Sequence, residues 1–517
     1  MQEAERHKNT SAKNITVWYI AVLAAAGILY VSTCAPGILW QDSGLFVYRI
    51  WHNDLEGNLG LALSHPLYII IGIAVKYIPF GDLAYKVNLI SAVFGAVTIA
   101  NLFLLLRLWL GKILPAIIGA VTLAVSWNFW QHSVIAEVYT LYTAGMLGEL
   151  IILLLYIRTE KCGYLYLLGF LNGLSITNHL LGTLSLSCYV VFAVILLLRR
   201  QVRLKHIGII ILLWAIGVSP YGYLIIKNAL SSGNVQTTLI SATVSNWQNS
   251  VLNTSISMKM IFENIIFILL NFPTPNFVLF FIGLWFLQKT RSDRSFVNIL
   301  LGILILYFVF AFRYTVPDRY SFFVPFYCIA AIIIGLGANA ILSRYNYKSL
   351  AALILVFALL PVAVYYVLPD VAKKVYKPLG QRRQRPYRDE YVYFLQPWKT
   401  DYNGAKRFAN EALNIVEENV VIYSDTTSVH PLLYVQEVKG GREDVKIISD
   451  YDMSKNAPVF TKDTIAELMK NSAVYVVSPI RGYCPEFLLD NYDFVQKGVL
   501  WKVTERKQEP SKGESIL

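Results

Sequence analysis

Charged residues are scarce in this chain, and their scarcity excludes an ordinary soluble globular protein. Asp, Glu, Lys and Arg make up 15% of the 517 residues, whereas about 25% is typical of soluble domains. Hydrophobic residues make up 56%, and the mean hydropathy is +0.50. Apolar runs long enough to cross a bilayer, which takes about 20 residues each, continue to Leu368. The composition therefore predicts a polytopic integral membrane protein.

Cysteines are also few, and their pattern excludes a disulfide framework. Their number is odd, and their spacing fits neither a disulfide-rich scaffold nor a zinc site. The five are Cys34, Cys162, Cys188, Cys328 and Cys484. We interpret them as small apolar packing residues.

The net charge of +12 does not indicate a nucleic-acid-binding protein. Such surfaces carry a basic stripe interleaved with aromatic side chains, and no such stripe occurs here. The cations lie instead in short clusters between apolar runs, which is the pattern of membrane topology. Nucleic acid is therefore not an expected partner.

About eleven transmembrane helices are predicted from the apolar runs. The expected spans are 15–35, 86–108, 113–130, 138–157, 163–180, 182–198, 207–226, 273–288, 296–312, 321–342 and 349–368. A shorter apolar piece, Leu67 to Ile78, is too short to span and is read as an interfacial or half-inserted helix.

Every second connection between these spans is basic. By the positive-inside rule, the basic connections are cytoplasmic, so the N-terminus is cytoplasmic and the chain after Leu368 lies outside. The cations concerned are Arg6, Lys8, Lys13, Arg107, Lys112, Arg158, Lys161, Arg199, Arg200, Arg203, Lys205, Lys289, Arg291, Arg294, Arg344 and Lys348. A basic stretch from Lys373 to Arg388 falls on the predicted outer side, where it is expected to form a collar on anionic headgroups.

The chain is expected to divide into a transmembrane domain, 1–368, with its first outer loop at 36–85, and an outer domain, 369–517. Strand and helix signals alternate in the outer domain, which predicts a small α/β fold. Helices are expected at 402–418 and 462–470, and strands at 420–424, 445–448 and 473–477. The residues after Glu505 are polar and expected to fray.

Polar residues at the membrane boundary gather in the predicted outer loops. They include Trp40-Gln41-Asp42-Ser43-Gly44, His65-Pro66, Ala136-Glu137-Val138-Tyr139, Thr177-Asn178-His179 and Asp318-Arg319-Tyr320. Each has a structural alternative. Asp42 and Glu137 could cap the helices that follow them, His179 could be a hydrogen-bonded structural histidine, and Arg319 could meet lipid phosphates.

Taken together, these residues suit transfer of a sugar from a lipid-phosphate carrier. A carboxylate at the outer face can act as a general base toward an acceptor hydroxyl, and cations at the same depth can hold a leaving phosphate. The four outer histidines lack helical i, i+4 spacing, and no Asp-x-Asp occurs in the outer loops. We therefore expect a metal-independent site without a cofactor.

The motifs resemble a family of membrane protein O-mannosyltransferases that act on immunoglobulin-like IPT domains, and in particular its prokaryotic relatives. The segments that carry the resemblance are Trp40–Gly44, His65-Pro66, Val87–Ala92, Ala136–Tyr139, Asn178-His179, Tyr434–Val438 and Gly441–Val445. The resemblance implies a GT-C fold and an inverting enzyme that uses a polyprenyl- or dolichol-phosphate sugar.

Carried over residue by residue, the resemblance makes Asp42 the catalytic base, Glu137 a second acidic residue, and Arg319-Tyr320 the pair that meets the carrier phosphate. The remaining expected substrate-binding residues are Gln41, Arg49, His65, Tyr139 and His179. Two departures stand out. Leu45 replaces the glutamate that usually ends the Asp-Ser-Gly-Glu motif, and Leu67-Tyr68-Ile69 replaces the usual Pro- and Gly-rich continuation after His-Pro.

The leading hypothesis is thus a membrane glycosyltransferase that moves a sugar, with mannose as one candidate, to a hydroxyl on the non-cytoplasmic face. The acceptor could be protein, lipid or glycan. The membrane would be the plasma membrane in a prokaryote or the endoplasmic reticulum in a eukaryote. The alternatives are a transporter or flippase of lipid-linked glycans, whose polar groups would lie at mid-membrane on broken helices, and a non-catalytic scaffold.

Overall fold

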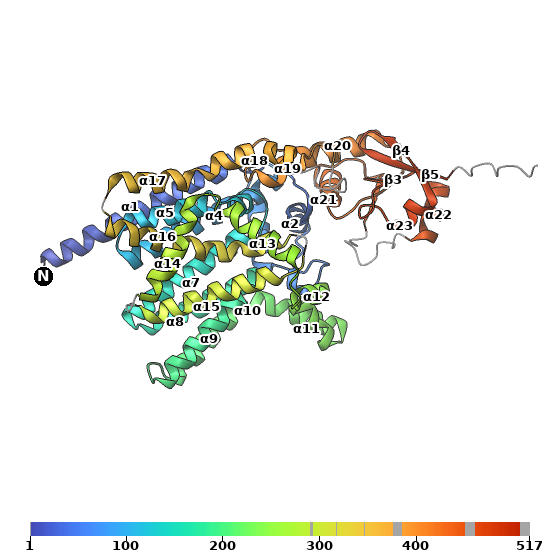
Figure 1. Ribbon diagram of the computed structural model, residues 1–517. Coiled ribbons are helices and arrows are strands. Elements are labelled where there is room, and N and C mark those ends of the chain that lie inside the picture. Colours follow the sequence, from blue (N-terminus) through green and yellow to red (C-terminus); the bar gives the residue numbers. More distant parts are fainter. Residues whose placement is uncertain are drawn as a thin grey trace, which may run out of the picture.

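The protein is a bundle of long helices with a small sheet domain at one end. The computed structural model describes residues 2–289, 293–316, 318–345, 347–375, 385–449 and 461–506. In Figure 1 the bundle occupies the side of the N-terminus, and the sheet domain lies at the opposite end, beyond α18 and next to α2.

The first part of the chain forms the helices on which most expected site residues lie. They are α1 (Gln2–Ser32), α2 (Gln41–Trp51), the short 3-10 helix η1 (Leu61–Leu63), α3 (Pro66–Lys76), α4 (Leu83–Leu110), α5 (Ile113–Ala124), α6 (Trp127–Ser133), α7 (Tyr139–Thr159), α8 (Cys162–Asn178), α9 (Gly182–Leu198) and α10 (Leu204–Ser232).

The second part continues the bundle and leads to the sheet domain. It comprises α11 (Val235–Thr243), η2 (Ser245–Trp247), α12 (Gln248–Val251), α13 (Met258–Asn271), η3 (Pro275–Phe277), α14 (Val278–Lys289), α15 (Arg294–Arg313), η4 (Arg319–Phe323), α16 (Val324–Arg344), α17 (Lys348–Leu359) and α18 (Pro361–Val375).

A membrane-spanning architecture is confirmed, while the number of spans is not settled at eleven. Among the described residues, seven helical segments are long and apolar enough to cross a membrane, and up to nine if two sharply bent helix pairs each count as one span. Every expected span overlaps a helix, but α8 and α9 have only 17 residues each. Eleven spans therefore stay a prediction. The apolar piece after His65 is the 11-residue helix α3.

Glycines allow close approach of helices in the bundle, as is common where membrane helices associate. A Cβ added at Gly173 of α8 would overlap the backbone of Trp214 in α10, and one at Gly217 of α10 would overlap the backbone of Phe170. Gly283 of α14 and Gly337 of α16 are matched in the same way. Backbone contact at these positions pairs α8 with α10 and α14 with α16.

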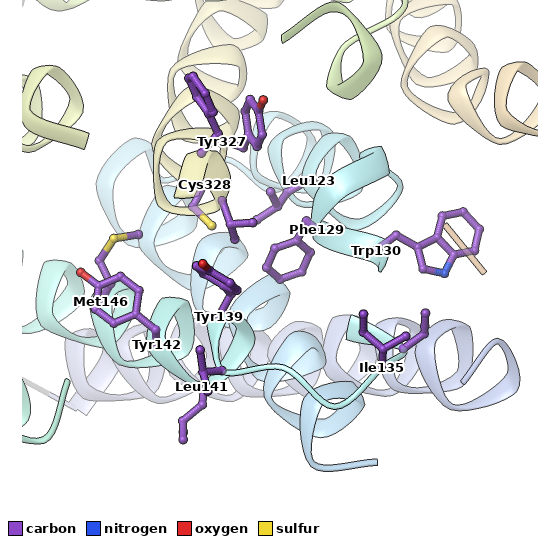
Figure 2. Close-up of a cluster of buried hydrophobic side chains, with 14 of the residues drawn as sticks. Leu123, Phe129, Trp130, Ile135, Tyr139, Leu141, Tyr142, Met146, Tyr327 and Cys328 are labelled. Atoms are coloured by element: carbon purple, nitrogen blue, oxygen red, sulfur yellow. The ribbon is translucent and has the colours of Figure 1, made fainter. Parts of the chain in front are cut away.

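Aromatic and sulfur-containing side chains fill the centre of the bundle. Figure 2 shows Phe129, Tyr139 and Tyr142 beside Tyr327 and Cys328, and all five are buried. Such a core between α6, α7 and α16 fixes the ends of the helices that lead into the outer loops.

The C-terminal part is a mixed five-stranded sheet with helices, which confirms the expected α/β character. The strand order is β2-β1-β3-β5-β4, with β1 parallel to β2 and β3, and β5 antiparallel to β3 and β4. The elements are α19 (Glu390–Leu395), α20 (Gly404–Ile415), β1 (Val421–Tyr423), α21 (Val429–Leu433), the π-helical turn η6 (Tyr434–Val438), β2 (Lys446–Ile448), α22 (Lys462–Asn471), β3 (Val474–Val476), α23 (Glu486–Asn491), β4 (Tyr492–Lys497) and β5 (Leu500–Glu505). The β4–β5 hairpin was not expected from the sequence.

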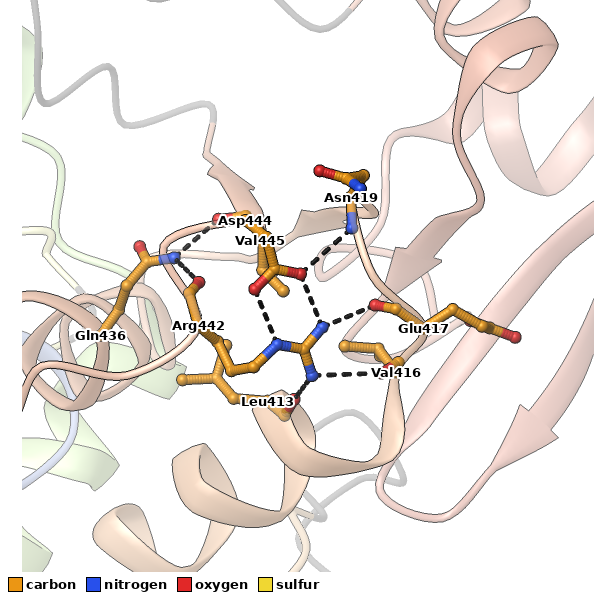
Figure 3. A network of polar contacts seen from close by, with 8 residues as sticks. All are labelled: Leu413, Val416, Glu417, Asn419, Gln436, Arg442, Asp444 and Val445. Carbon is orange, nitrogen blue, oxygen red and sulfur yellow. Dashed lines mark hydrogen bonds and ion pairs between the residues drawn. The ribbon is translucent and has the colours of Figure 1, made fainter.

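The Gly441–Val445 motif stabilises the C-terminal domain through the side chain of Arg442. Arg442 donates to the main-chain carbonyls of Leu413 and Glu417, both at 2.6 Å, and pairs with Asp444 at 2.8 Å (Figure 3). Since the last carbonyls of a helix have no partner within it, Arg442 stabilises the end of α20 and the chain that enters β1.

The described cations of the basic stretch from Lys373 to Arg388 fall into two groups. Lys373 and Lys374 are exposed, whereas Arg385 and Arg388 are buried, so the expected collar on anionic headgroups stays a prediction. Arg385 is buried and pairs with Asp425 at 2.7 Å, and Arg388 is buried and pairs with Glu390 at 2.6 Å. Burying the guanidinium groups requires these carboxylate partners. Residues 376–384 of the stretch, and the expected polar tail at 507–517, lie outside the described residues.

Candidate active site

Three carboxylic acids surround one cavity at the end of the bundle that faces the sheet domain. The cavity has a volume of about 180 Å³, and Asp42, Glu137 and Asp318 all line it. A second lobe of about 110 Å³ shares Asp42 and Asp318 with it. Because the three residues come from α2, the loop before α7 and the turn before η4, only the folded bundle brings them together.

Asp42 lies in the first turn of α2 and is exposed to this cavity. The helix begins after Trp40, and no side chain caps its N-terminus, so Asp42 is not the cap that one interpretation of the sequence allowed. Gln41 adopts a left-handed φ of 57° and donates its main-chain N–H to the carbonyl of Thr427 at 3.1 Å. The C-terminal domain thus holds the backbone on which Asp42 sits.

Gly44 explains why the motif needs a glycine two residues after Asp42. A Cβ at this position would lie 2.7 Å from the carbonyl oxygen of Leu39 and 2.9 Å from Cβ of His430. Both distances are too short for non-bonded atoms, so a side chain here would push α2 away from α21. The next residue, Leu45, lines both lobes of the cavity.

The other motif residues hold the loop that carries Glu137. Ser43 accepts the main-chain N–H of Ala136 at 3.1 Å, and Ser91 accepts that of Glu137 at 3.0 Å. Asn178 donates to the carbonyl of Val138 at 2.9 Å. Buried loops must have their backbone groups satisfied, and these three side chains do so on the Glu137 loop.

The pKa values of the three carboxylic acids of the cavity are raised above their usual range. Desolvation by the surrounding protein, together with the charge of Asp318, raises the pKa of Asp42. Desolvation raises the pKa of Asp318, and desolvation together with the charges of Asp42 and Asp318 raises that of Glu137 well above its usual value. Acids close together in a poorly hydrated cavity cannot all ionise at little cost, so one of them is suited to hold or release a proton near neutral pH.

Two histidines complete the polar lining. His132 has its Nδ1 2.8 Å from the carbonyl of Asn128 and its Nε2 2.9 Å from Oγ of Ser321. His430 comes from α21 of the C-terminal domain, and burial lowers its pKa to about 3. His430 is therefore neutral at physiological pH and adds no positive charge to the cavity.

The structure brings together five of the nine expected site residues. Asp42, Gln41, Glu137 and Tyr320 line the main cavity, and His65 lines the second lobe.

Tyr139 and His179 form an aromatic layer behind the cavity lining. The rings of His65 and His179 are 5.0 Å apart, and those of Tyr139 and His179 are 5.3 Å apart. His65 is in addition within hydrogen-bonding distance, 2.7 Å, of the Asn178 carbonyl. These contacts give His179 a packing role and orient His65 toward the second lobe.

Arg49, one of the expected substrate-binding residues, does not line either lobe of the cavity. Its guanidinium is buried and donates to four main-chain carbonyls of the first outer loop, including that of Ser64 at 2.8 Å, with Asp54 at 3.7 Å. The guanidinium group of Arg49 thus interacts with the backbone of the first outer loop. The geometry gives Arg49 a structural role in the loop, and its expected contact with substrate stays a prediction.

Arg319 has a partner that was not foreseen. Its guanidinium forms an ion pair with Glu263 of α13 and lies over the ring of Phe267 at 5.5 Å. Its Nε has no hydrogen-bond partner among the described residues. Arg319 therefore lies at the side of η4 away from the cavity lining, and its Nε is buried without a partner in the described part of the chain.

Several cavity residues escaped sequence reasoning. Asp318 was noted only as a neighbour of Arg319, and Trp247, Tyr393, Thr426 and His430 lie far from the first outer loop in sequence. The pattern Asp318-Arg319-Tyr320 could have suggested Asp318, because it stands at the start of a late helix. No local signal marks the other four. Among the described residues, no three His, Cys, Asp or Glu side chains are grouped so that they could hold a metal ion.

The fold is that of a polytopic membrane protein with a C-terminal sheet domain. The solved structure of ArnT from Cupriavidus metallidurans, bound to undecaprenyl phosphate, matches 94% of this chain and 98% of its own length, with a TM-score of 0.62 and 14% sequence identity. The expected GT-C-like fold class is thereby confirmed.

The sequence comparisons point to a particular group of proteins. Residues 62–205 match the family model described as the N-terminal domain of protein O-mannosyl-transferase TMEM260. The mouse protein O-mannosyl-transferase TMEM260 is 25% identical over 359 residues, which cover 63% of this chain. The chain spans about half the length of that relative. The resemblance to O-mannosyltransferases expected from the motifs is confirmed.

Proposed function

We propose that this protein is a membrane glycosyltransferase that moves a sugar from a polyprenyl- or dolichol-phosphate donor to an acceptor hydroxyl. The observation that carries the proposal is the cavity in which Asp42, Glu137 and Asp318 meet at one end of the bundle. The similarity to O-mannosyl-transferase TMEM260 and the ArnT-like fold support it. Mannose is the first candidate sugar, because the sequence relative is named for its transfer.

In this proposal Asp42 is the general base. It faces the cavity from the first turn of α2, and its raised pKa brings it closer to neutral pH, where a base is most effective. Deprotonation of the acceptor hydroxyl accompanies its attack on the anomeric carbon, the bond from that carbon to the phosphate oxygen breaks, and lipid phosphate leaves. Direct displacement of this kind inverts the anomeric centre. The reaction is proposed to be independent of metal ions.

The donor phosphate is proposed to meet Arg319 from outside the cavity. The positive charge of Arg319 and the adjacent Tyr320, which lines the cavity, would place the phosphate at the border of η4. Charge-assisted bonds of this type are the strong ones for phosphate recognition.

The acceptor is proposed to enter from the side of the C-terminal domain. Tyr393, Phe394, Thr426 and His430 from that domain form part of the cavity wall. Aromatic and hydroxyl side chains of this kind suit a polar acceptor with an apolar body. We further propose that the region 369–517 works as a separate acceptor-binding domain on the non-cytoplasmic face, with the N-terminus in the cytoplasm.

The proposal is tested with the purified protein in detergent, supplied with polyprenyl-phosphate mannose and a mixture of Ser- and Thr-containing peptides. We expect the wild type to consume the donor and label the peptides, and Asp42→Asn to be slower by about 10²-fold or more. Asp370→Asn, the same change on an exposed residue of α18, is the matched control. Donor that is left intact in detergent but moved across vesicle membranes would instead indicate a flippase. Wild-type rates in Asp42→Asn would rule out the role of Asp42.

A further inference from the structure

A second depression lies at the other end of the bundle from the carboxylate cavity. It has a volume of about 360 Å³ and runs between α9 and the tightly joined pair α8 and α10. Figure 1 shows α9 at the edge of the bundle, directed away from its neighbours. Leu165 and Leu168 line the groove from the first half of α8, whereas Asn178, at the end of α8, holds the Glu137 loop. The groove is therefore remote from the proposed site of transfer.

The wall of this groove is almost entirely hydrocarbon. Phe192 and Leu197 of α9 face Ile207, Ile210 and Trp214 of α10 across it. Its volume falls in the range of sites that bind small molecules. On the membrane-facing side of a bundle, such a groove suits a flexible acyl chain.

A turn rich in cations closes the groove at the end where α9 meets α10. Arg199, Arg200, Arg203 and Lys205 lie within seven residues, and all four side chains are exposed. In the part of the chain that the structure describes, none of them pairs with a carboxylate. By contrast, Arg158 at the same end of the bundle is paired with Asp293 at 2.8 Å. The turn thus presents four uncompensated positive charges immediately beside the apolar groove.

We propose that this groove and turn form a binding site for an anionic diacyl phospholipid. One acyl chain would occupy the groove between α9 and the α8–α10 pair, and the phosphate of the headgroup would contact the turn from Arg199 to Lys205. The positive charges of the turn favour an anionic headgroup, and the apolar wall of the groove favours an acyl chain. The site lies on the cytoplasmic leaflet in the predicted orientation, so its ligand is distinct from a donor bound at the carboxylate cavity.

The test uses native mass spectrometry of the purified full chain in detergent, titrated with dioleoyl phosphatidylglycerol or dioleoyl phosphatidylcholine. We expect the anionic lipid to bind about tenfold more tightly, because each cation near an anionic headgroup strengthens binding severalfold. The triple variant Arg199→Gln, Arg200→Gln, Arg203→Gln should lose this preference. The variant Ala193→Phe, which fills the groove without changing charge, should weaken binding of both lipids.

The matched control removes three cations from the same end of the bundle but away from the groove, in Lys112→Gln, Arg344→Gln, Lys348→Gln. This control should keep the tenfold preference. If Ala193→Phe fails to fold, the two charge variants decide the matter, because they alter exposed side chains only. Equal binding of the two lipids, an equal loss in the control, or displacement of phosphatidylglycerol by undecaprenyl phosphate would each overturn the proposal.

Discussion

The carboxylate of Glu437 lies 2.7 Å from Nε2 of His52, so the π-helical turn η6 of the C-terminal domain is fastened to the helix that carries Asp42. Glu437 also accepts a hydrogen bond from the Tyr48 hydroxyl at 3.1 Å. Tyr434 of the same turn bonds to Asp82, and Lys439, which follows the turn, pairs with Asp82 at 2.6 Å. The Tyr434–Val438 motif therefore joins the C-terminal domain to the first outer loop.

Breaking this link should affect transfer modestly. His52 and Glu437 are partly exposed, and such pairs contribute about 0.2–1 kcal/mol. We expect Glu437→Ala to slow transfer by about twofold to fivefold because α2 is held less firmly, with little change in the donor KM. Glu443→Ala, on an exposed residue of the same domain, should behave as wild type. An unchanged rate in Glu437→Ala, measured by donor consumption, would contradict a positioning role.

The pH dependence of transfer should report the interaction between Asp42 and Asp318. A general base must be ionised, and the pKa of Asp42 is raised, so the rate should climb as pH rises through that raised pKa. Asp318→Asn removes a negative neighbour and lowers the pKa of Asp42, so the rising limb should move to lower pH by about half to one unit. Asp370→Asn should leave the profile unmoved, and a shift of the limb to higher pH in Asp318→Asn would exclude this coupling.

A methyl group added at Gly44 should lower both the stability of the protein and its transfer activity. Gly44→Ala places Cβ against Leu39 and His430, and overpacking of this kind destabilises by about 1–3 kcal/mol. We expect a lower melting temperature and loss of most transfer activity, because α2 must move. Gly37→Ala is the control, since a Cβ there meets no atom within 4 Å. Wild-type melting and activity in Gly44→Ala would show that α2 and α21 can separate freely.

The variant Arg319→Lys should distinguish a role of Arg319 in phosphate binding from a role in stability. A lysine keeps the charge and can still reach Glu263, but it lacks the planar fork that suits phosphate. We expect the donor KM to rise about tenfold, equivalent to about 1.4 kcal/mol, with a small change in melting temperature. Arg313→Lys provides the comparison, because Arg313 donates to the carbonyls of Val251 and Asn253. A large drop in melting temperature with an unchanged KM would assign Arg319 to structure alone.

Much of the architecture could be read from local patterns. Apolar runs predict helices because a bilayer leaves the backbone no other partner than itself, and alternating strand and helix signals predict the sheet domain. The number of spans could not be obtained in this way. The 17-residue helices α8 and α9, and the bends of 71° between α5 and α6 and of 108° between α13 and α14, depend on packing against neighbours.

In the candidate site, too, some features could be predicted from the sequence and others depend on packing. The sequence by itself determined the residue types of the predicted outer loops, so Asp42, Glu137 and Tyr320 could be selected as candidates before any geometry was known. Only the tertiary structure decided which polar residues share a cavity. It added Asp318 and His430, directed Arg49 to main-chain carbonyls and paired Arg319 with Glu263. The physical reason is that a side chain's partners are set by the packing of segments distant in sequence, and no local pattern encodes that packing.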